Sequence, residues 1–205
     1  MHVTVQTAQA SRRSAGFTLV ELMIAMALAA VIVGLAVPNA QAFIKDSRLV
    51  SASNDLLHSL QLARGSAITS QKDVAVCASA DPFAVHPICN YGPFNGWIVF
   101  EDRNSSWQVE PSEQILERHA LLDSSVTVRI DNDGIESYNQ SGFASPAGTK
   151  SPVRTILICD ERGTEQIGNS SPARAVRIEN TGRPRVTRDP VDIAQALTAV
   201  ASPCP

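Results

Sequence analysis

The sequence predicts an α+β protein in which one long N-terminal helix precedes a β-rich domain, and three observations lead to this class. An almost unbroken apolar run extends from Phe17 to Val37. Beyond it, apolar residues recur at three-, four- and seven-residue spacings as far as Ala67, which is typical of a helix with one buried face. From Asp73 onward, short β-like runs alternate with turn residues, which predicts a mainly antiparallel sheet arrangement.

The apolar run has the length of a membrane-spanning helix. At a rise of about 1.5 Å per residue, residues 17–37 cross a hydrocarbon core of about 30 Å. Arg12 and Arg13 precede the run, and positive charge before a first span holds that end in the cytoplasm. We therefore expect a single-pass protein whose C-terminal bulk lies on the other side of the membrane.

The composition limits the possible functions of the chain. Its 205 residues leave room for one compact domain plus an anchor. A net charge of −3 argues against global attraction to nucleic acid, so such binding needs a local basic patch. All four cysteines lie outside the apolar run, which is typical of a domain exported to an oxidising compartment.

The residues before the apolar run do not resemble an ordinary secretory signal, whose cleavage site follows its apolar core. Here the small residues come first, in the run SAGFTLVE from Ser14 to Glu21. This run resembles the recognition site of type IV prepilins. The resemblance implies that a prepilin peptidase cuts between Gly16 and Phe17 and that the new N-terminal Phe17 is methylated. Cleavage would remove two arginines and no acidic residue, so the net charge would become about −5.

Glu21 is an unusual residue for a membrane anchor, because an acidic side chain at the centre of a span costs about 3 kcal/mol. The prepilin resemblance implies a partner for it, the N-terminal amine of Phe17 in a neighbouring subunit. The alternative is a glutamate near the end of the span that snorkels to the interface.

The expected domain organisation has four parts: a leader (1–16), a membrane-spanning and polymerising helix (17–37), an amphipathic continuation (38–70) and a β-rich domain (71–205). Pro38 is expected to kink the helix without ending it, and the helix is expected to end between Ser66 and Gln71. The expected strands are Val74–Ala78, Gly96–Glu101, Ser125–Ile130, Thr155–Cys159 and Ala175–Ile178. Asp102–Ser106 and Ser141–Pro152 are expected to be surface loops, and Val191–Val200 either a short helix or a draped tail.

The domain resembles the GspH/FimT group of minor pilins and pseudopilins. The run NGWIVFED, Asn95–Asp102, is similar to the GWxVFxD pattern of that group, and the segment ILERHAL follows it at Ile115–Leu121. The resemblance implies a long helix against an antiparallel, β-sandwich-like pair of sheets. It implies either a minor pilin of a type IV pilus or the minor pseudopilin H of a type II secretion system.

Five arginines form the one basic concentration in this acidic chain: Arg174, Arg177, Arg183, Arg185 and Arg188. Gly182–Arg185 (GRPR) matches a GRxR motif of the FimT branch, whose members resemble DNA receptors for natural transformation. Guanidinium groups on an exposed loop would bridge DNA phosphates without reading bases, which predicts weak, salt-sensitive binding. The alternative is that these arginines decorate a solvent-facing strand and that the subunit serves assembly alone.

Two disulfides are expected, and no metal. Cys77 and Cys89 bracket a short loop, and closing it would stabilise the fold by about 3 kcal/mol, while a Cys159–Cys204 pair would tie the tail to a strand. A zinc site at the first pair is disfavoured because its spacing matches no zinc pattern. Asp131–Gly134 resembles the start of a calcium loop, but an Asp-Gly turn between strands explains it better.

No pattern indicates catalysis: the chain has no nucleophile elbow, no glycine-rich phosphate loop and no paired His-Glu metal motif. We expect a non-enzymatic protein without a cofactor, located in the bacterial inner membrane with its domain in the periplasm and able to enter a pilus or pseudopilus. Its expected partners are other pilins or pseudopilins, the prepilin peptidase, the membrane and, for the arginine strip, DNA.

Overall fold

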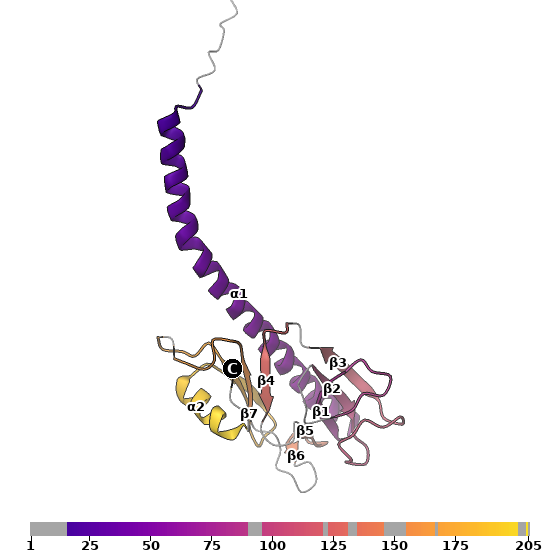
Figure 1. Ribbon diagram of the computed structural model, residues 1–205. Helices are drawn as coiled ribbons and strands as arrows, with labels where there is room; N and C mark the ends of the chain where they lie inside the picture. The colour runs from indigo at the N-terminus through magenta and orange to yellow at the C-terminus, as the bar shows by residue number, and fades with distance from the viewer. Residues whose placement is uncertain are drawn as a thin grey trace, which may run out of the picture. The chain divides into compact units, whose positions relative to one another are not determined.

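The computed structural model describes residues 16–89, 96–120, 123–130, 135–145, 155–166, 168–200 and 204. Two helices and nine strands are assigned within these ranges, and Figure 1 labels most of them. The helices are α1 (Leu19–Ser70) and α2 (Pro190–Ala199). The strands are β1 (Val74–Ser79), β2 (Gly96–Glu101), β3 (Ile115–Ala120), β4 (Thr127–Ile130), β5 (Ile135–Tyr138), β6 (Ala144–Ser145), β7 (Thr155–Cys159), β8 (Arg174–Ile178) and β9 (Pro184–Thr187).

Helix α1 runs through Pro38 and belongs to two compact units, which divide between Phe43 and Ile44. In the first unit its large apolar side chains are exposed along the whole length from Leu19 to Val37. In the second unit the helix continues to Ser70 with a buried stripe that includes Leu49, Leu56 and Leu60. The observed end of the helix confirms the predicted one.

The strands form two antiparallel sheets. Sheet A has the order β3-β2-β1-β5-β6, and sheet B has the order β4-β7-β8-β9. The inner side chains of both sheets, such as Val76 and Val176, share one core with the stripe on α1. This arrangement confirms the predicted fold class, a long N-terminal helix packed on antiparallel sheets.

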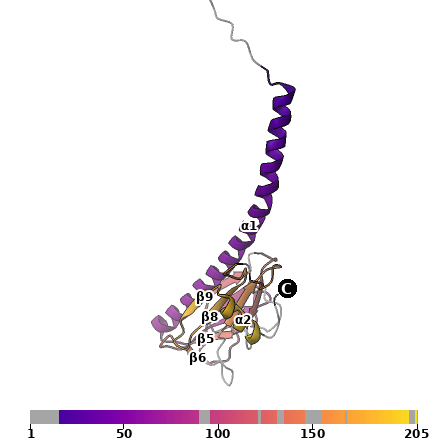
Figure 2. The same cartoon turned by 90° about the vertical axis from the view of Figure 1, so that its left-hand side faces the viewer.

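Each sheet also has a covered outer face. On sheet B, α2 lies against β7 and β8, and Figure 2 shows it beside β8. Ile193 packs there among Leu157 and Ala175. Helix α2 begins where Asp189 caps it, since the Asp189 carboxylate accepts a hydrogen bond from the Val191 backbone N–H at 2.8 Å. The 191–200 tail is therefore a helix rather than a draped segment.

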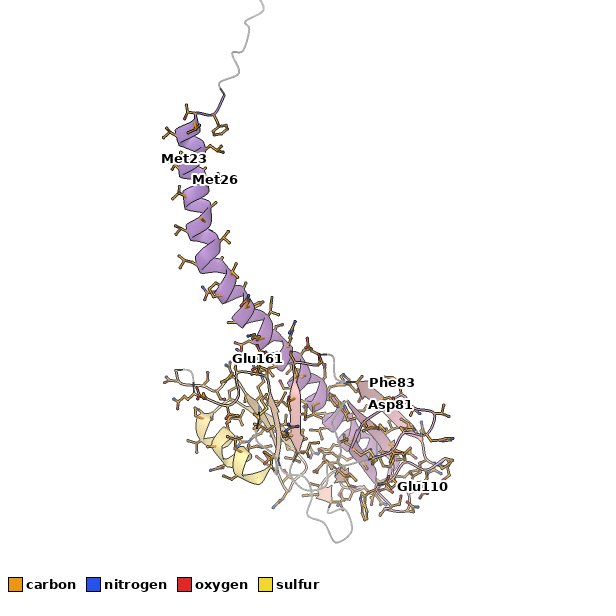
Figure 3. The ribbon with its side chains drawn as sticks, in the orientation of Figure 1. Met23, Met26, Asp81, Phe83, Glu110 and Glu161 are labelled. Atoms are coloured by element: carbon orange, nitrogen blue, oxygen red, sulfur yellow. A yellow bond between two sulfur atoms is a disulfide. The ribbon has the colours of Figure 1, made fainter. Side chains whose placement is uncertain are left out.

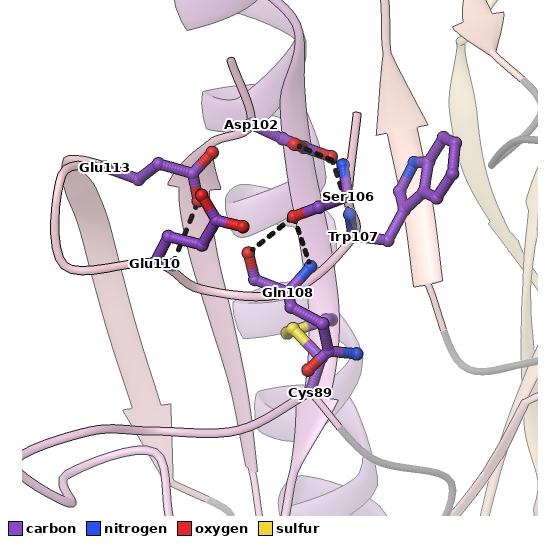
Figure 4. Close-up of a disulfide and its surroundings, with 8 residues drawn as sticks. Cys89, Asp102, Ser106, Trp107, Gln108, Glu110 and Glu113 are labelled. Carbon is purple, nitrogen blue, oxygen red and sulfur yellow. Dashed lines mark hydrogen bonds between the residues drawn. A yellow bond between two sulfur atoms is a disulfide. The ribbon is translucent and has the colours of Figure 1, made fainter. Parts of the chain in front are cut away.

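On sheet A the outer cover consists of loops. The loop after β2 folds back so that Trp107 and Val109 pack against Ile98 and Phe100. Asp102 directs this loop, because its carboxylate accepts hydrogen bonds from the backbone N–H groups of Ser106 and Trp107 at 3.0 and 3.1 Å (Figure 4). Its side chain is buried, and burial raises the pKa of Asp102 against the opposing effect of those two hydrogen bonds. The predicted surface loop thus begins with a buried anchor.

Five expected strands exist, with boundaries that match or shift by one or two residues. The prediction missed β3, β5, β6 and β9. Strand β9 was not predicted because it begins with Pro184, and proline is unfavourable inside a sheet. The proline is tolerated here because it is the first residue of an edge strand. Strands β3 and β5 carry charged residues among their apolar ones, so neither shows a clean apolar pattern.

Candidate functional site

The N-terminal segment is exposed, and it has a local reason for its sequence. Phe17 is 85 % exposed, and α1 begins two residues later. The Thr18 hydroxyl accepts a hydrogen bond from the Glu21 backbone N–H at 3.2 Å, which is the geometry of a helix N-cap. A threonine followed three residues later by glutamate is also a capping-box pattern, a signal in the sequence that marks the start of a helix. Thr18 and Glu21 therefore have a local structural role at the start of the helix, independent of any role in processing or assembly.

The first part of α1 has the length and apolar character to cross a membrane. None of its most apolar stretch is buried by the rest of the chain. A soluble core helix would be covered, so this segment requires apolar surroundings that the chain itself does not supply.

The five arginines do not form one strip. Arg177 on β8 lies opposite Arg185 on β9, so both side chains project from the outer face of sheet B. Arg174 and Arg188 fall on the other side of the sheet by the same alternation. The structure therefore divides the predicted strip between two faces, with Arg183 at the turn between the strands.

The prediction that Arg174 belongs to an exposed basic strip is wrong, because its side chain is buried. Its side chain is only 8 % exposed, and its Nε makes no hydrogen bond with any residue that the structure describes. Burial, and then the neighbouring Arg188, lower the pKa of Arg174. Arg188 itself donates from Nε to the Ser171 carbonyl at 3.3 Å. Neither side chain lies on the same face as Arg177 and Arg185.

Arg177 is held by α2. Its Nη1 donates to Asp192, with which it forms a salt bridge, and to the Gln195 side chain at 3.3 Å. Asp192 also accepts a hydrogen bond from the Thr187 hydroxyl at 2.9 Å. The Thr187 hydrogen bond and then Arg177 hold the pKa of Asp192 below its usual range. Much of the charge of Arg177 is therefore neutralised within the protein.

Arg183 and Arg185 are the most available members of the set. Both are exposed, and Arg185 Nε forms a long salt bridge of 3.9 Å with Glu179. Arg177 and Arg185 also line an open pocket of about 350 Å³, together with Thr155, Ile178, Glu179 and Asn180. This hairpin tip can present two guanidinium groups to an anion.

Gly182 of the GRPR run has a structural explanation. Its φ of +75° favours glycine, and a Cβ at this position would lie 2.3 Å from the Gly142 carbonyl oxygen in the turn between β5 and β6. The β8–β9 turn thus touches the turn between β5 and β6 through a contact that only glycine allows. Gly182 positions Arg183 but contributes no binding chemistry of its own.

The structure joins Cys77 to Cys89 and Cys159 to Cys204, the same pairs as the sequence suggests. The two thiols considered for zinc are therefore consumed in a disulfide. Among the described residues, no group of three His, Cys, Asp or Glu side chains could hold a metal ion.

Asp131–Gly134 lies outside the described residues. The strands on either side of it, β4 and β5, belong to different sheets.

Two family models match the chain. Residues 11–37 match the prokaryotic N-terminal methylation motif, and residues 52–182, more than half of the chain, match the model of type II transport protein GspH. The chain belongs to the GspH family. It combines the domain of type II transport protein GspH with an N-terminal methylation motif.

The GspH-family chain is also similar to two proteins of known structure. One is the type IV minor pilin FimU of Pseudomonas aeruginosa, with 18% identity, 80% of this chain and 99% of that chain covered, and a TM-score of 0.46. The other is the minor pseudopilin EpsH of the type 2 secretion system of Vibrio cholerae, with 12% identity, coverage of 69% and 97%, and a TM-score of 0.45. No curated protein matches the chain.

Proposed function

We propose that this chain is a FimT-like minor pilin, a non-enzymatic subunit of a type IV pilus that captures DNA through its β8–β9 hairpin. The observation that carries the proposal is the exposure of Arg183 and Arg185 at the tip of that hairpin. Exposed guanidinium groups with little acidic compensation would bind backbone phosphates without regard to sequence. Each subunit would bind weakly, and a filament with several contacts along one DNA molecule would bind more strongly.

The proposal includes the processing and assembly of the subunit. The prepilin peptidase would cleave between Gly16 and Phe17, and Phe17 would be methylated. Residues 17–37 would hold the subunit in the inner membrane, with the domain in the periplasm, until the helix packs against other pilins in the filament. Glu21 would then neutralise the N-terminal amine of a neighbouring subunit, which lowers the cost of a carboxylate in apolar surroundings.

The β8–β9 hairpin limits how much charge is available for this capture. Arg177 is bound to Asp192, and Arg174 and Arg188 lie on the other side of sheet B. Binding would thus depend on Arg183 and Arg185, with a smaller contribution from Arg177. The proposed site is a tip, not a strip along the strand.

A second candidate function is that of the minor pseudopilin H of a type II secretion system. The description of the matching family, type II transport protein, favours it. In this role the same anchor would prime a periplasmic pseudopilus, and the exposed arginines would have no nucleic-acid ligand.

DNA binding by the full chain in detergent separates the two functions. We expect duplex DNA to bind at low salt and to dissociate as salt rises, because binding releases condensed counterions. Arg183→Gln should weaken binding and reduce the slope of log K against log salt by about 1, while Arg183→Lys keeps most of the affinity.

The matched control is Arg103→Gln, which removes an exposed arginine in the loop just after β2, where it pairs with Glu101. It should leave the affinity almost unchanged. If the unaltered chain does not bind DNA at low salt, or if Arg103→Gln weakens binding as much as Arg183→Gln does, the DNA-capture proposal is wrong and the secretion or pure-assembly role is favoured.

A further inference from the structure

The turn between β5 and β6 lies against the tip of the β8–β9 hairpin, and it carries an exposed aromatic side chain. A Cβ on Gly182, the residue before Arg183, would lie 2.3 Å from the Gly142 carbonyl oxygen and 3.1 Å from the Ala144 backbone nitrogen. Phe143 lies between those two residues and is 50% exposed. The fold therefore places a phenylalanine beside the hairpin tip, although the two segments are far apart in the sequence.

Hydrogen bonds within the β5–β6 turn hold the backbone of Phe143 in place. The Asn139 side-chain oxygen accepts hydrogen bonds from the backbone N–H groups of Ser141 and Phe143 at 3.0 and 3.1 Å. The Asn139 backbone N–H donates to the Phe143 carbonyl oxygen at 3.1 Å, and the Gly142 N–H donates to the Asn139 carbonyl oxygen at 2.8 Å. Because these bonds fix the turn, a ligand would meet a preorganised aromatic surface.

Three arginines contribute positive charge near Phe143. Arg183 and Arg185 are exposed at the hairpin tip. Arg64 on α1 donates from Nε to the Gly142 carbonyl oxygen at 2.9 Å, and this contact does not neutralise its charge because the acceptor is uncharged. Glu179 offsets part of the charge of Arg185, at a distance of 3.9 Å. An exposed ring among cations is the composition of surfaces that bind single-stranded nucleic acid, where bases stack on rings and phosphates meet the cations.

We propose that Phe143 is a stacking platform for an unpaired base, so that the hairpin tip binds single-stranded DNA through a contact that duplex DNA cannot make. This inference rests on the proposed function, in which Arg183 and Arg185 bind DNA phosphates. Both forms of DNA offer phosphates to these arginines. In a duplex, however, the faces of the bases are stacked on one another, so the ring cannot reach a base unless that base leaves the stack.

Titration of the full chain in detergent with an oligothymidylate and with a duplex of equal length tests the proposal. Phe143→Leu should weaken binding of the oligothymidylate about tenfold, because it removes one stacked base, and should leave the duplex affinity unchanged. Stacking releases no counterions, so Phe143→Leu should not change the slope of log K against log salt, whereas Arg183→Gln should reduce it. Phe143→Tyr keeps an aromatic ring and should retain most of the affinity.

Phe83 provides the matched control, because it is an exposed phenylalanine far from the hairpin tip. It is 62% exposed and lies in the loop 80–89, which follows Ser79 at one end of β1. Val74, at the other end of β1, pairs with Tyr138, and the Tyr138 ring lies beside the hairpin tip. Figure 3 shows Phe83 at the upper right of the β-rich domain, whereas β6 lies at its lower edge in the same orientation. Phe83→Leu should leave both affinities unchanged.

Phe143→Trp gives a direct measurement of stacking that does not depend on how well Phe143→Leu folds. Its tryptophan emission would be compared with that of the unaltered chain, which contains Trp97 and Trp107. We expect the oligothymidylate to quench the added emission and the duplex to leave it unchanged, because only an unpaired base can stack on the indole ring. If the oligothymidylate binds without quenching this emission, the stacking contact does not exist.

The outcomes separate this inference from the proposed function. If Phe143→Leu weakens neither DNA, or weakens both equally, the stacking contact is wrong, while a loss of binding in Arg183→Gln would still support DNA capture by the hairpin. An equal loss in Phe83→Leu would also overturn the stacking contact. If the unaltered chain binds neither DNA at low salt, the proposed function is wrong and the stacking contact is wrong with it.

Discussion

The outer faces of the two sheets are covered in different ways. Sheet B is covered by a helix, since α2 buries Ile193 and Ala196 against β7 and β8. Sheet A is covered by two loops, and its outer cluster contains Trp107 and Val109. A disulfide sits in each cover: Cys159–Cys204 in the cluster under α2 and Cys77–Cys89 in the cluster under the loops.

The difference shows two ways to keep an outer face dry. Helix α2 satisfies its own backbone, so its attachment rests on an apolar face, a disulfide and the side-chain contacts of Asp192 with Arg177 and Thr187. The loops over sheet A have no such internal bonding, and buried polar groups such as Asp102 must supply it. We therefore expect sheet B to depend on its disulfide and sheet A to depend on its disulfide and its polar contacts together.

The largest loss of stability should follow from removal of the Cys159–Cys204 disulfide, which holds the cover of sheet B. The cysteines of this pair are 45 positions apart, so removing the disulfide with Cys159→Ser/Cys204→Ser should cost about 4 kcal/mol in the chain-entropy model. Hydrogen exchange of the full chain in detergent measures this loss, which should be greatest in α2, β7 and β8. Unchanged protection in α2 would contradict the dependence of sheet B on its tie.

A somewhat smaller loss of stability should follow from removal of the Cys77–Cys89 disulfide, which holds the cover of sheet A. The Cys77–Cys89 pair is separated by 12 positions, so Cys77→Ser/Cys89→Ser should cost about 3 kcal/mol. The loss of protection should centre on β1 and the loop 80–89 and should leave α2 largely protected. If α2 loses as much protection as β1, the two covers are not independent.

The smallest effect concerns acid stability. Hydrogen bonding by Lys72 is the main cause that holds the pKa of the buried Glu101 below its ordinary value of 4.5. This stabilisation is present above pH 4.5 and is lost as the pH falls through the lower folded pKa. Lys72→Met should therefore lower the free energy of unfolding by about 1 kcal/mol at neutral pH, since Lys72 is 40% exposed. It should also make the decrease of stability between neutral and acidic pH smaller.

Sheet B offers the matched comparison. Thr187→Val removes the hydrogen bond that contributes most to the lowered pKa of Asp192. It should therefore reduce the loss of hydrogen-exchange protection at low pH in α2 but not in β2. Protection measured by hydrogen exchange between pH 7 and pH 3 follows both sheets in one experiment. Parallel pH profiles for the unaltered chain and Lys72→Met would show that Glu101 does not contribute.

The sequence predicted the apolar pattern of the fold better than its polar contacts. Helix α1 and the buried strands were predicted because their apolar periodicity is strong. The GWxVFxD resemblance was recognised without its physical reasons. A Cβ on Gly96 would lie 2.1 Å from the His119 carbonyl oxygen, and Trp97 donates to the Ser59 hydroxyl at 2.7 Å and stacks on His119.

The arginines show the opposite case. Sequence spacing placed five positive charges near one another, but it could not show that β9 pairs with β8. That pairing decides which face each arginine occupies, and the acid that holds Arg177 comes from α2. The arginines that are close in sequence are therefore separated in the structure: Arg183 and Arg185 lie at the hairpin tip, Arg177 is bound to α2, and Arg174 is buried.

The position of β4 has a consequence for cooperativity. In the chain, β4 lies between β3 and β5 of sheet A, yet it pairs with β7 of sheet B. Neither sheet is therefore a continuous segment, and a truncation after β6 that keeps every strand of sheet A leaves β4 without its partner β7. The two sheets share a single core with α1, so once both disulfides are formed the domain should unfold in one transition rather than sheet by sheet.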